Sequence, residues 1–255
     1  MEKITDIELY NTQMSRSMQD KLFFLNEIKE SDADMIVDFG CANGELLKQV
    51  PYSWNKIGID NSVEMREEAV KNFNGGLYFD NLNEVSNIDK SNAIINLSSV
   101  IHEVYSYLPK EEVDKFWDQI FNSNYKYIVI RDMMISEKTN RDMTLDDVRM
   151  LCLSRQSSLF RDFHSLYHMW RVRDMIHFFM KYRYTENWER EKRENYFPIT
   201  KEELIALIPK NYEIVYHAEY ALDWTKNKIK EDFGYELKDN THIKLILKRV
   251  DIDKN

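Results

Sequence analysis

A turn of small residues that follows an acidic residue is the most informative chemical feature of this sequence. Residues 35–47 read MIVDFGCANGELL, so an apolar run containing Asp38 leads through a turn into a second apolar stretch. The turn consists of Gly40, Cys41, Ala42, Asn43 and Gly44. We expect a strand, a tight turn and the start of a helix. Small residues let backbone N–H groups approach a ligand at the carboxyl end of a parallel strand, so the segment predicts a ligand-binding loop.

Two acidic residues near this turn indicate the kind of ligand. Asp60 ends a second apolar run 16 residues after Gly44. A carboxylate at this place can accept hydrogen bonds from both hydroxyls of a ribose. The dinucleotide pattern Gly-x-Gly-x-x-Gly, which holds a pyrophosphate, is absent, and Asp38 would repel a pyrophosphate but can help to hold an ammonium group. We therefore expect an adenosine that carries an amino acid rather than a phosphate chain.

The segment resembles motif I of the class I S-adenosylmethionine-dependent methyltransferases, which reads acidic-x-Gly-x-Gly-x-Gly. Asp38, Gly40 and Gly44 match this motif, and Ala42 replaces the middle glycine with another small residue. The resemblance extends over roughly residues 35–135. It implies the fold and the activity of this family.

The resemblance also implies S-adenosylmethionine as the cofactor. Asp60 would hold the ribose, Asp80 would bind the adenine amino group, and the backbone of the turn would hold the methionine part. We expect the cofactor site to comprise Asp38, Gly40, Cys41, Ala42, Gly44, Asp60, Asn61, Ser62, Asp80, Asn81, Asn96 and Ser98.

Candidate catalytic residues follow the fourth predicted strand. Many small-molecule methyltransferases carry an apolar-apolar-His segment there, and Val100, Ile101 and His102 resemble it. His102 can take a proton from a hydroxyl or amine near neutral pH, or can instead cap or pack against the cofactor. Glu103 is the second catalytic candidate, with a structural or solvated role as the alternative. Other polar candidates at the strand ends are Asn96, Ser98, Ser99, Arg131 and Asp132.

Histidine and cysteine spacing predicts no metal site. His164 and His168 lie four residues apart, which would place both on one helical face, but no third ligand follows at a recognisable interval. Cys41 lies where a thiolate would be favoured, and we interpret it as a small loop residue beside the cofactor. Cys41 and Cys152 form no redox or metal spacing, which favours a reducing cytosol.

The elements that position these residues alternate between strands and helices. Strands are predicted within 35–47 and at 56–59, 77–79, 93–98, 126–131, 212–220 and 242–250. Helices are predicted at 16–30, at 62–72 with Ser62 as the cap, at 110–121, and from the Thr200/Glu203 capping box through 208. Residues 221–240 are expected to form a long polar connection. The order predicts a doubly wound, mostly parallel seven-stranded Rossmann-like sheet with an antiparallel last strand.

A helical insertion is expected after the fifth strand. Residues 142–195 contain no Gly or Pro and are rich in Met, Arg and aromatic residues. We therefore divide the chain into a core of 1–141 and 196–255 and an insertion of 142–195. Within it, 149–193 carries ten basic and five acidic side chains, so its net charge is +5 on a chain of net charge −9. The insertion is expected to be a lid over a small acceptor. The alternatives are a basic surface for RNA and a helical subdomain whose basic face is only solvated.

Composition limits the remaining function classes. The net charge disfavours a general nucleic-acid binder, and no apolar run approaches the roughly 20 residues of a membrane helix. The N-terminus lacks the apolar region of a secretory signal, so we expect a cytoplasmic protein. The sequence predicts methyl transfer to a small molecule. The alternatives are an RNA methyltransferase and a catalytically silent protein that binds the cofactor and a partner.

Overall fold

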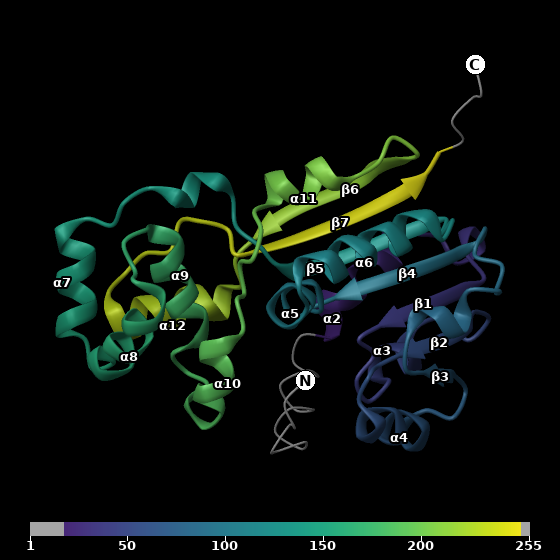
Figure 1. The fold of residues 1–255 in the computed structure, drawn as a ribbon, viewed down its shortest axis with the longest axis horizontal. Helices are drawn as coiled ribbons and strands as arrows, with labels where there is room; N and C mark the ends of the chain where they lie inside the picture. Colours follow the sequence, from purple (N-terminus) through teal and green to yellow (C-terminus); the bar gives the residue numbers. More distant parts are fainter. Residues whose placement is uncertain (1–17, 251–255) are drawn as a thin grey trace.

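The computed structural model describes residues 18–250 and is organised around a seven-stranded sheet (Figure 1). The strand order is β3-β2-β1-β4-β5-β7-β6, and β7 runs opposite to the other six strands. The strands are β1 Met35–Phe39, β2 Asn55–Ile59, β3 Leu77–Phe79, β4 Ala93–Ser98, β5 Tyr127–Met133, β6 Tyr212–Tyr220 and β7 His242–Arg249. The predicted fold class is confirmed, including the antiparallel last strand.

The central strands are apolar because both of their faces are covered. Every residue of β4 is buried, as is expected of a parallel strand between two layers of helices. The polar exceptions lie at the carboxyl ends, where the register places Asp38 of β1 beside Asn96 of β4. The strand order reverses between β1 and β4, and ligands of open parallel sheets bind at such a switch point.

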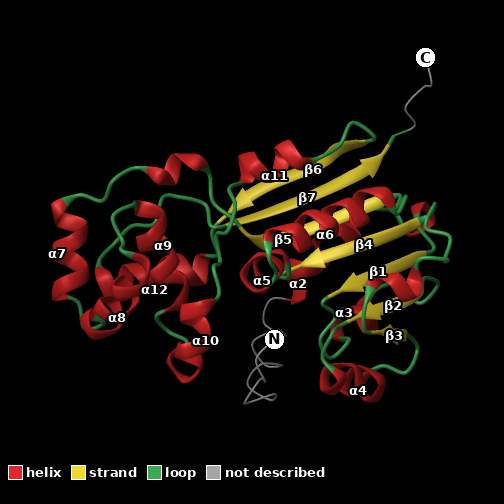
Figure 2. Cartoon of the chain, viewed as in Figure 1, coloured by secondary structure: helices red, strands yellow, loops and turns green. Residues whose placement is uncertain are grey.

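Helices cover both faces of the sheet (Figure 2). They are α2 Met18–Lys21, α3 Glu45–Gln49, α4 Val63–Asn72, α5 Ile101–Tyr107, α6 Lys110–Asn122 and α11 Lys201–Leu207. Ser62 caps α4 by accepting a hydrogen bond from the Met65 N–H, and Thr200 and Glu203 form the predicted capping box of α11. The caps are therefore where the sequence signals place them.

The helix predicted at 16–30 is only partly correct. Residues 16 and 17 lie outside the described residues. The rest forms the single turn α2 followed by a 3₁₀ segment, Leu22–Asn26, so the predicted continuous helix is wrong. The apolar side chains of this segment are still buried, with Phe24 inside the core cluster that includes Ile36 and Leu47. Packing against the sheet, rather than helical periodicity, determines the local conformation.

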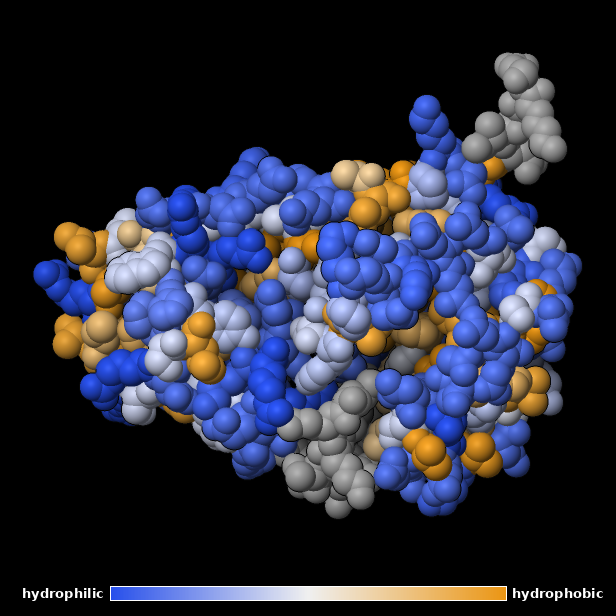
Figure 3. Space-filling model, in the orientation of Figure 1, coloured by the Kyte–Doolittle hydropathy of each residue, from blue (hydrophilic) through white to orange (hydrophobic). Residues whose placement is uncertain are grey.

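A helical lobe lies beside the sheet (Figure 1). It contains α7 Leu145–Leu153, α8 Ser157–Tyr167, α9 Val172–Lys181 and α10 Trp188–Arg193. The lobe has an apolar cluster of its own, in which Phe163, Phe178 and Phe197 are buried. Figure 3 shows a largely hydrophilic surface with small separate apolar patches, one of them over the end of the lobe that carries α7.

Residues 221–240 are not the polar connection that the sequence predicts. They contain α12 Asp223–Phe233, whose buried side chains Ile229 and Phe233 belong to the apolar cluster of the lobe. The rings of Phe233 and Phe179 lie 4.8 Å apart. The lobe is therefore built from two separate chain segments. Within residues 18–250, no helix is both long and apolar enough to cross a lipid bilayer.

Candidate functional site

The turn after β1 has the left-handed backbone that its small residues suggest. Gly40, Ala42 and Gly44 have φ angles of 77°, 46° and 72°. A Cβ atom on Gly40 would lie 2.9 Å from Cγ2 of Val100, so only glycine fits. Ala42 adopts a conformation that costs a residue with a side chain about 1 kcal/mol or more. Its replacement of the motif glycine is therefore sterically small but conformationally costly.

Asp60 holds this turn in place. Its Oδ2 accepts a hydrogen bond from the Ala42 N–H at 2.9 Å, and its Oδ1 accepts one from the Ser62 N–H at 2.9 Å. The first bond fixes the costly conformation of Ala42. Each carboxylate oxygen has a further lone pair, so Asp60 can still accept hydrogen bonds from a ligand.

Asp38 is a buried carboxylate at the switch point. It is 3% exposed, and its Oδ1 accepts a hydrogen bond from Nδ2 of Asn96 at 2.7 Å. The amide oxygen of Asn96 in turn accepts a hydrogen bond from Ser98 at 2.9 Å. Burial raises the pKa of Asp38 to about 6, although the Asn96 hydrogen bond and the charge of Lys21 oppose the shift. This network explains why an amide interrupts the otherwise apolar β4.

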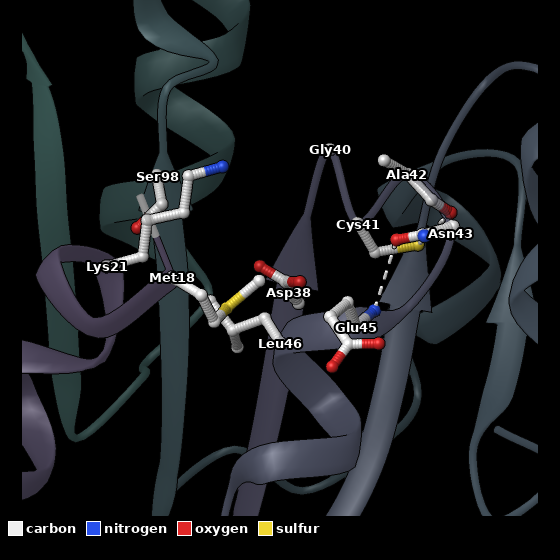
Figure 4. Close-up of a pocket in the computed structure, with 10 residues that line it drawn as sticks. All are labelled: Met18, Lys21, Asp38, Gly40, Cys41, Ala42, Asn43, Glu45, Leu46 and Ser98. Atoms are coloured by element: carbon white, nitrogen blue, oxygen red, sulfur yellow. Dashed lines mark hydrogen bonds between the residues drawn. The ribbon is translucent and has the colours of Figure 1, made fainter. Parts of the chain in front are cut away.

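A pocket opens between α2, the turn and the end of β4 (Figure 4). Its lining residues are Met18, Lys21, Asp38, Gly40, Cys41, Ala42, Asn43, Glu45, Leu46 and Ser98. Five of the predicted cofactor residues are among them. The other five were not in the predicted cofactor site. Asn43, Glu45 and Leu46 belong to the predicted turn and the start of the helix after it, whereas Met18 and Lys21 lie on α2, which carried no motif and was treated only as an amphipathic helix. Burial, followed by the charge of Arg131, lowers the pKa of Lys21 to about 8.

The remaining predicted cofactor residues lie at the same carboxyl edge. Asp60 follows β2, and Asp80 and Asn81 follow β3. Asn61, Asp80 and Asn81 are exposed. Asn81 caps a 3₁₀ turn by accepting a hydrogen bond from the Asn83 N–H at 2.9 Å. The edge therefore presents one acidic residue at the carboxyl end of each of three neighbouring strands.

A buried His–Asp pair lies on the other side of this edge. Nδ1 of His102 is 2.8 Å from Oδ1 of Asp132, and Oδ2 of Asp132 accepts a hydrogen bond from the Ile101 N–H at 2.7 Å. Burial opposes protonation of His102, but the charge and hydrogen bond of Asp132 outweigh it, so the pKa of His102 is raised. Asp132 accepts the Nδ1 proton of neutral His102, which leaves Nε2 as a proton acceptor. Sequence reasoning found both residues but not their pairing.

Residues of the lobe cover this pair. The Tyr196 ring meets the His102 ring edge-on, with the ring centres 5.4 Å apart. Glu103 pairs with Arg190 at 3.4 Å, and Arg190 also donates to Glu194 at 2.8 Å. Glu103 therefore joins the core to the lobe, which favours its structural alternative over the catalytic one.

The other histidines and Cys41 have structural surroundings. Nδ1 of His164 accepts a hydrogen bond from the Met169 N–H at 3.1 Å, and His168 ends α8 with a φ of 46°. In the described part of the chain, no group of three or more His, Cys, Asp or Glu residues is arranged to hold a metal ion. Burial, then the charges of Asp38 and Asp60, raise the pKa of Cys41, so the thiol stays protonated.

Replacing Asp38 by Asn tests the cost of its buried charge. The substituted side chain would keep an oxygen for the Asn96 hydrogen bond but would carry no charge. The pKa of Asp38 is about 6 in the fold, against 3.8 for the ordinary residue, so its ionisation costs up to about 3 kcal/mol of unfolding free energy above pH 6. The cost disappears as pH falls below about 4, because both states are then protonated.

We expect Asp38→Asn to raise the free energy of unfolding by about 1–3 kcal/mol at pH 7.5, and by less at pH 4.5. Urea denaturation at the two pH values measures the difference. Asp118→Asn, at an exposed position of α6, makes the same change of charge and should have little effect at either pH. Destabilisation by Asp38→Asn at pH 7.5 would contradict this account of the buried carboxylate.

No protein-family profile matches this chain, and no curated protein matches its sequence. Solved structures do match its fold. The methyltransferase domain of bacterial CtHen1-C is 12% identical, with 92% of this chain and 99% of that chain covered and a TM-score of 0.53. A SAM-dependent methyltransferase from Anabaena variabilis ATCC 29413 is 16% identical, with 93% and 85% covered and a TM-score of 0.52.

The mitomycin 7-O-methyltransferase MmcR is 15% identical, with 95% of this chain and 57% of that chain covered and a TM-score of 0.50. At these identities the likeness is one of fold. The chain has the seven-stranded fold of these methyltransferases.

Proposed function

We propose that this protein is an S-adenosylmethionine-dependent methyltransferase that acts on a small-molecule acceptor. The observation that carries the proposal is the pocket at the switch point, where the left-handed turn and the buried Asp38 lie together. The shared fold supports the same conclusion, because the matched structures are methyltransferases by name.

The order of the acidic residues supports the choice of cofactor. Asp38 lies near the end of β1, and Asp60 and Asp80 directly follow β2 and β3; the three strands are consecutive in the sheet. Neighbouring strands are about 4.8 Å apart, so the row spans roughly 10 Å. This row suits a ligand with an ammonium group at one end, a ribose in the middle and an adenine amino group at the other. A dinucleotide would bring a pyrophosphate against Asp38, and burial makes that repulsion strong.

His102 and Asp132 supply the acid–base chemistry. S-adenosylmethionine, when bound, supplies an electrophilic methyl group whose bonding electrons leave with the sulfur. His102 Nε2 would take the proton that the acceptor loses on methylation. Asp132 fixes the tautomer and stabilises the imidazolium that forms. The residues around the pocket would add to the rate by positioning the acceptor and excluding water.

The charges of the lobe support a small acceptor over RNA. Many of its basic side chains are paired with acidic ones, as in Arg183 with Asp232 at 2.6 Å and Arg171 with Asp142 at 2.9 Å. Lys192 pairs with both Asp162 and Glu189. These pairs reduce the net positive field that a polyanion needs. The His102–Asp132 pair also argues against a silent binding protein, because a histidine poised beside a buried carboxylate suits proton transfer.

Labelling tests the reaction and its acceptor class together. The protein is incubated with methyl-labelled S-adenosylmethionine and a fractionated cell extract. We expect label to enter the small-metabolite fraction. Label that entered only RNA would favour an RNA methyltransferase. No transfer to any fraction would favour a protein that binds the cofactor without catalysis.

His102→Ala tests the proposed base. We expect methylation of the acceptor molecule to slow by about 10²–10⁴-fold, because the side chain that removes its proton is gone. Binding of S-adenosylhomocysteine, measured by calorimetry, should stay near the wild-type value. The wild-type rate should rise with pH through the raised pKa of His102, because only the neutral imidazole accepts a proton, and the variant should lose this dependence.

His217→Ala is the matched control, since His217 lies on β6 and pairs with Glu219. Equal losses of turnover and of ligand affinity in His102→Ala would place this residue in the cofactor pocket. Unchanged turnover would show that His102 is not the base, and catalysis would then depend on how the acceptor is positioned.

A further inference from the structure

The lobe contacts the helix of the proposed base through a short stretch of chain. Helix α5, which carries this base near its start, lies at the end of the sheet that faces the lobe (Figure 1). Residues 194–196, here called the junction segment, directly follow α10. The carboxylate of Glu194 accepts a hydrogen bond from the Tyr107 hydroxyl at 2.9 Å. The Asn195 N–H donates to the Ser106 hydroxyl at 2.8 Å, so successive residues of the segment bind α5.

The junction segment also reaches His102 itself. The Ser106 hydroxyl, which accepts the hydrogen bond from Asn195, donates to the His102 carbonyl at 2.7 Å. The Tyr196 ring meets the His102 ring edge-on, with the ring centres 5.4 Å apart. Asp132 binds the same histidine from β5. His102 is therefore held by the sheet on one side and by the lobe on the other.

Tyr196 is in turn fixed by buried groups that take no part in the proposed proton transfer. Its hydroxyl donates a hydrogen bond to Glu191, and its N–H donates to Nε2 of His177 at 3.2 Å. The Lys181 ammonium group lies 4.1 Å from the centre of the Tyr196 ring. Lys181 is fully buried, and its ammonium group donates to the main-chain carbonyls of Glu191 and Glu194. This cluster keeps the Tyr196 ring in a defined position beside the proposed base.

We propose that the junction segment positions His102 for proton transfer, so that the lobe supplies part of the reaction centre. The inference rests on the proposed function and deepens it, because a lid would need only to cover the acceptor. The Tyr196 ring limits the orientations of the His102 ring, while Asp132 fixes its tautomer. Tyr196 and Glu194 act through His102, so they are positioning residues rather than catalytic ones.

The charge of Glu194 provides a measurable link to His102. The charged and titratable groups around this histidine are Asp132 on β5, Glu103 on α5, His177 on α9, Arg190 on α10, and Glu194 and Tyr196 in the junction segment. Burial opposes protonation of the histidine, but the carboxylates of Asp132, Glu103 and Glu194 raise its pKa. Glu194 is only 3% exposed, so water screens its charge weakly.

Nuclear magnetic resonance titration of the histidine side chains tests this link without an acceptor. Glu194→Gln keeps an oxygen for the hydrogen bonds from Tyr107 and Arg190 but removes the charge. We expect the pKa of His102 to be lower than in the wild type, because the imidazolium loses one stabilising carboxylate. Glu189→Gln makes the same change at an exposed position of α10 and should leave this pKa unchanged.

Turnover of the acceptor that labelling identifies tests the Tyr196 ring. We expect Tyr196→Leu to slow methyl transfer by about 10–100-fold, because the His102 ring loses the surface that orients it. Tyr196→Phe keeps the ring and should stay within about 3-fold of the wild type. Tyr182→Leu is the matched control, since Tyr182 is also buried in the lobe and donates to the carboxylate of Asp232. It should slow turnover by less than about 3-fold, and circular dichroism verifies that each variant is folded.

The possible results separate this inference from the function on which it rests. An unchanged or raised pKa of His102 in Glu194→Gln would overturn the inference, as would turnover of Tyr196→Leu within about 3-fold of the wild type. An equal loss of turnover in Tyr182→Leu would also overturn it, because the effect would then come from a loosened lobe. A wild type that transfers no methyl group would overturn the proposed function, while the titration of His102 would still decide the inference.

Discussion

A buried carboxylate at the end of β1 is the constraint on which the site depends. Asp38 is largely removed from water, so groups that the fold brings to it must stabilise most of its charge. The Asn96 amide on β4 donates a hydrogen bond to the Asp38 carboxylate, and the charge of Lys21 on α2 also favours its ionised form. Because the pKa of Asp38 remains raised, these groups stabilise its charge only in part. The positive charge of a ligand would stabilise the Asp38 carboxylate further. The proposed site would therefore favour ligands that carry an ammonium group.

The fifth strand organises both sides of the proposed reaction centre. Successive side chains of a strand point to opposite faces, so Arg131 and Asp132 face different layers. Arg131 fixes Asp20 and therefore the helix that closes the pocket. Asp132 fixes His102, which would act on the acceptor. One short segment of β5 thus positions both the cofactor pocket and the proposed base.

Local patterns were sufficient to predict most of the fold and the centre of the site. The strand positions, the Ser62 cap and the small-residue turn follow from neighbouring residues, and the structure has them where predicted. Partnerships between distant residues were not predictable in this way. His102 and Asp132 are 30 residues apart, and they meet because α5 begins just after β4, which pairs with β5. Likewise α12 has few apolar residues, so its role became visible only when Ile229 and Phe233 were found inside the lobe.

The central claim is that the pocket selects an adenosine carrying an amino acid and rejects a pyrophosphate. Calorimetric titration of the wild-type protein with S-adenosylhomocysteine and, separately, with NAD⁺ tests it most directly. The buried Asp38 and the row of acidic residues predict saturable binding of S-adenosylhomocysteine and none of NAD⁺. Binding of NAD⁺, or the absence of binding by S-adenosylhomocysteine, would contradict the account.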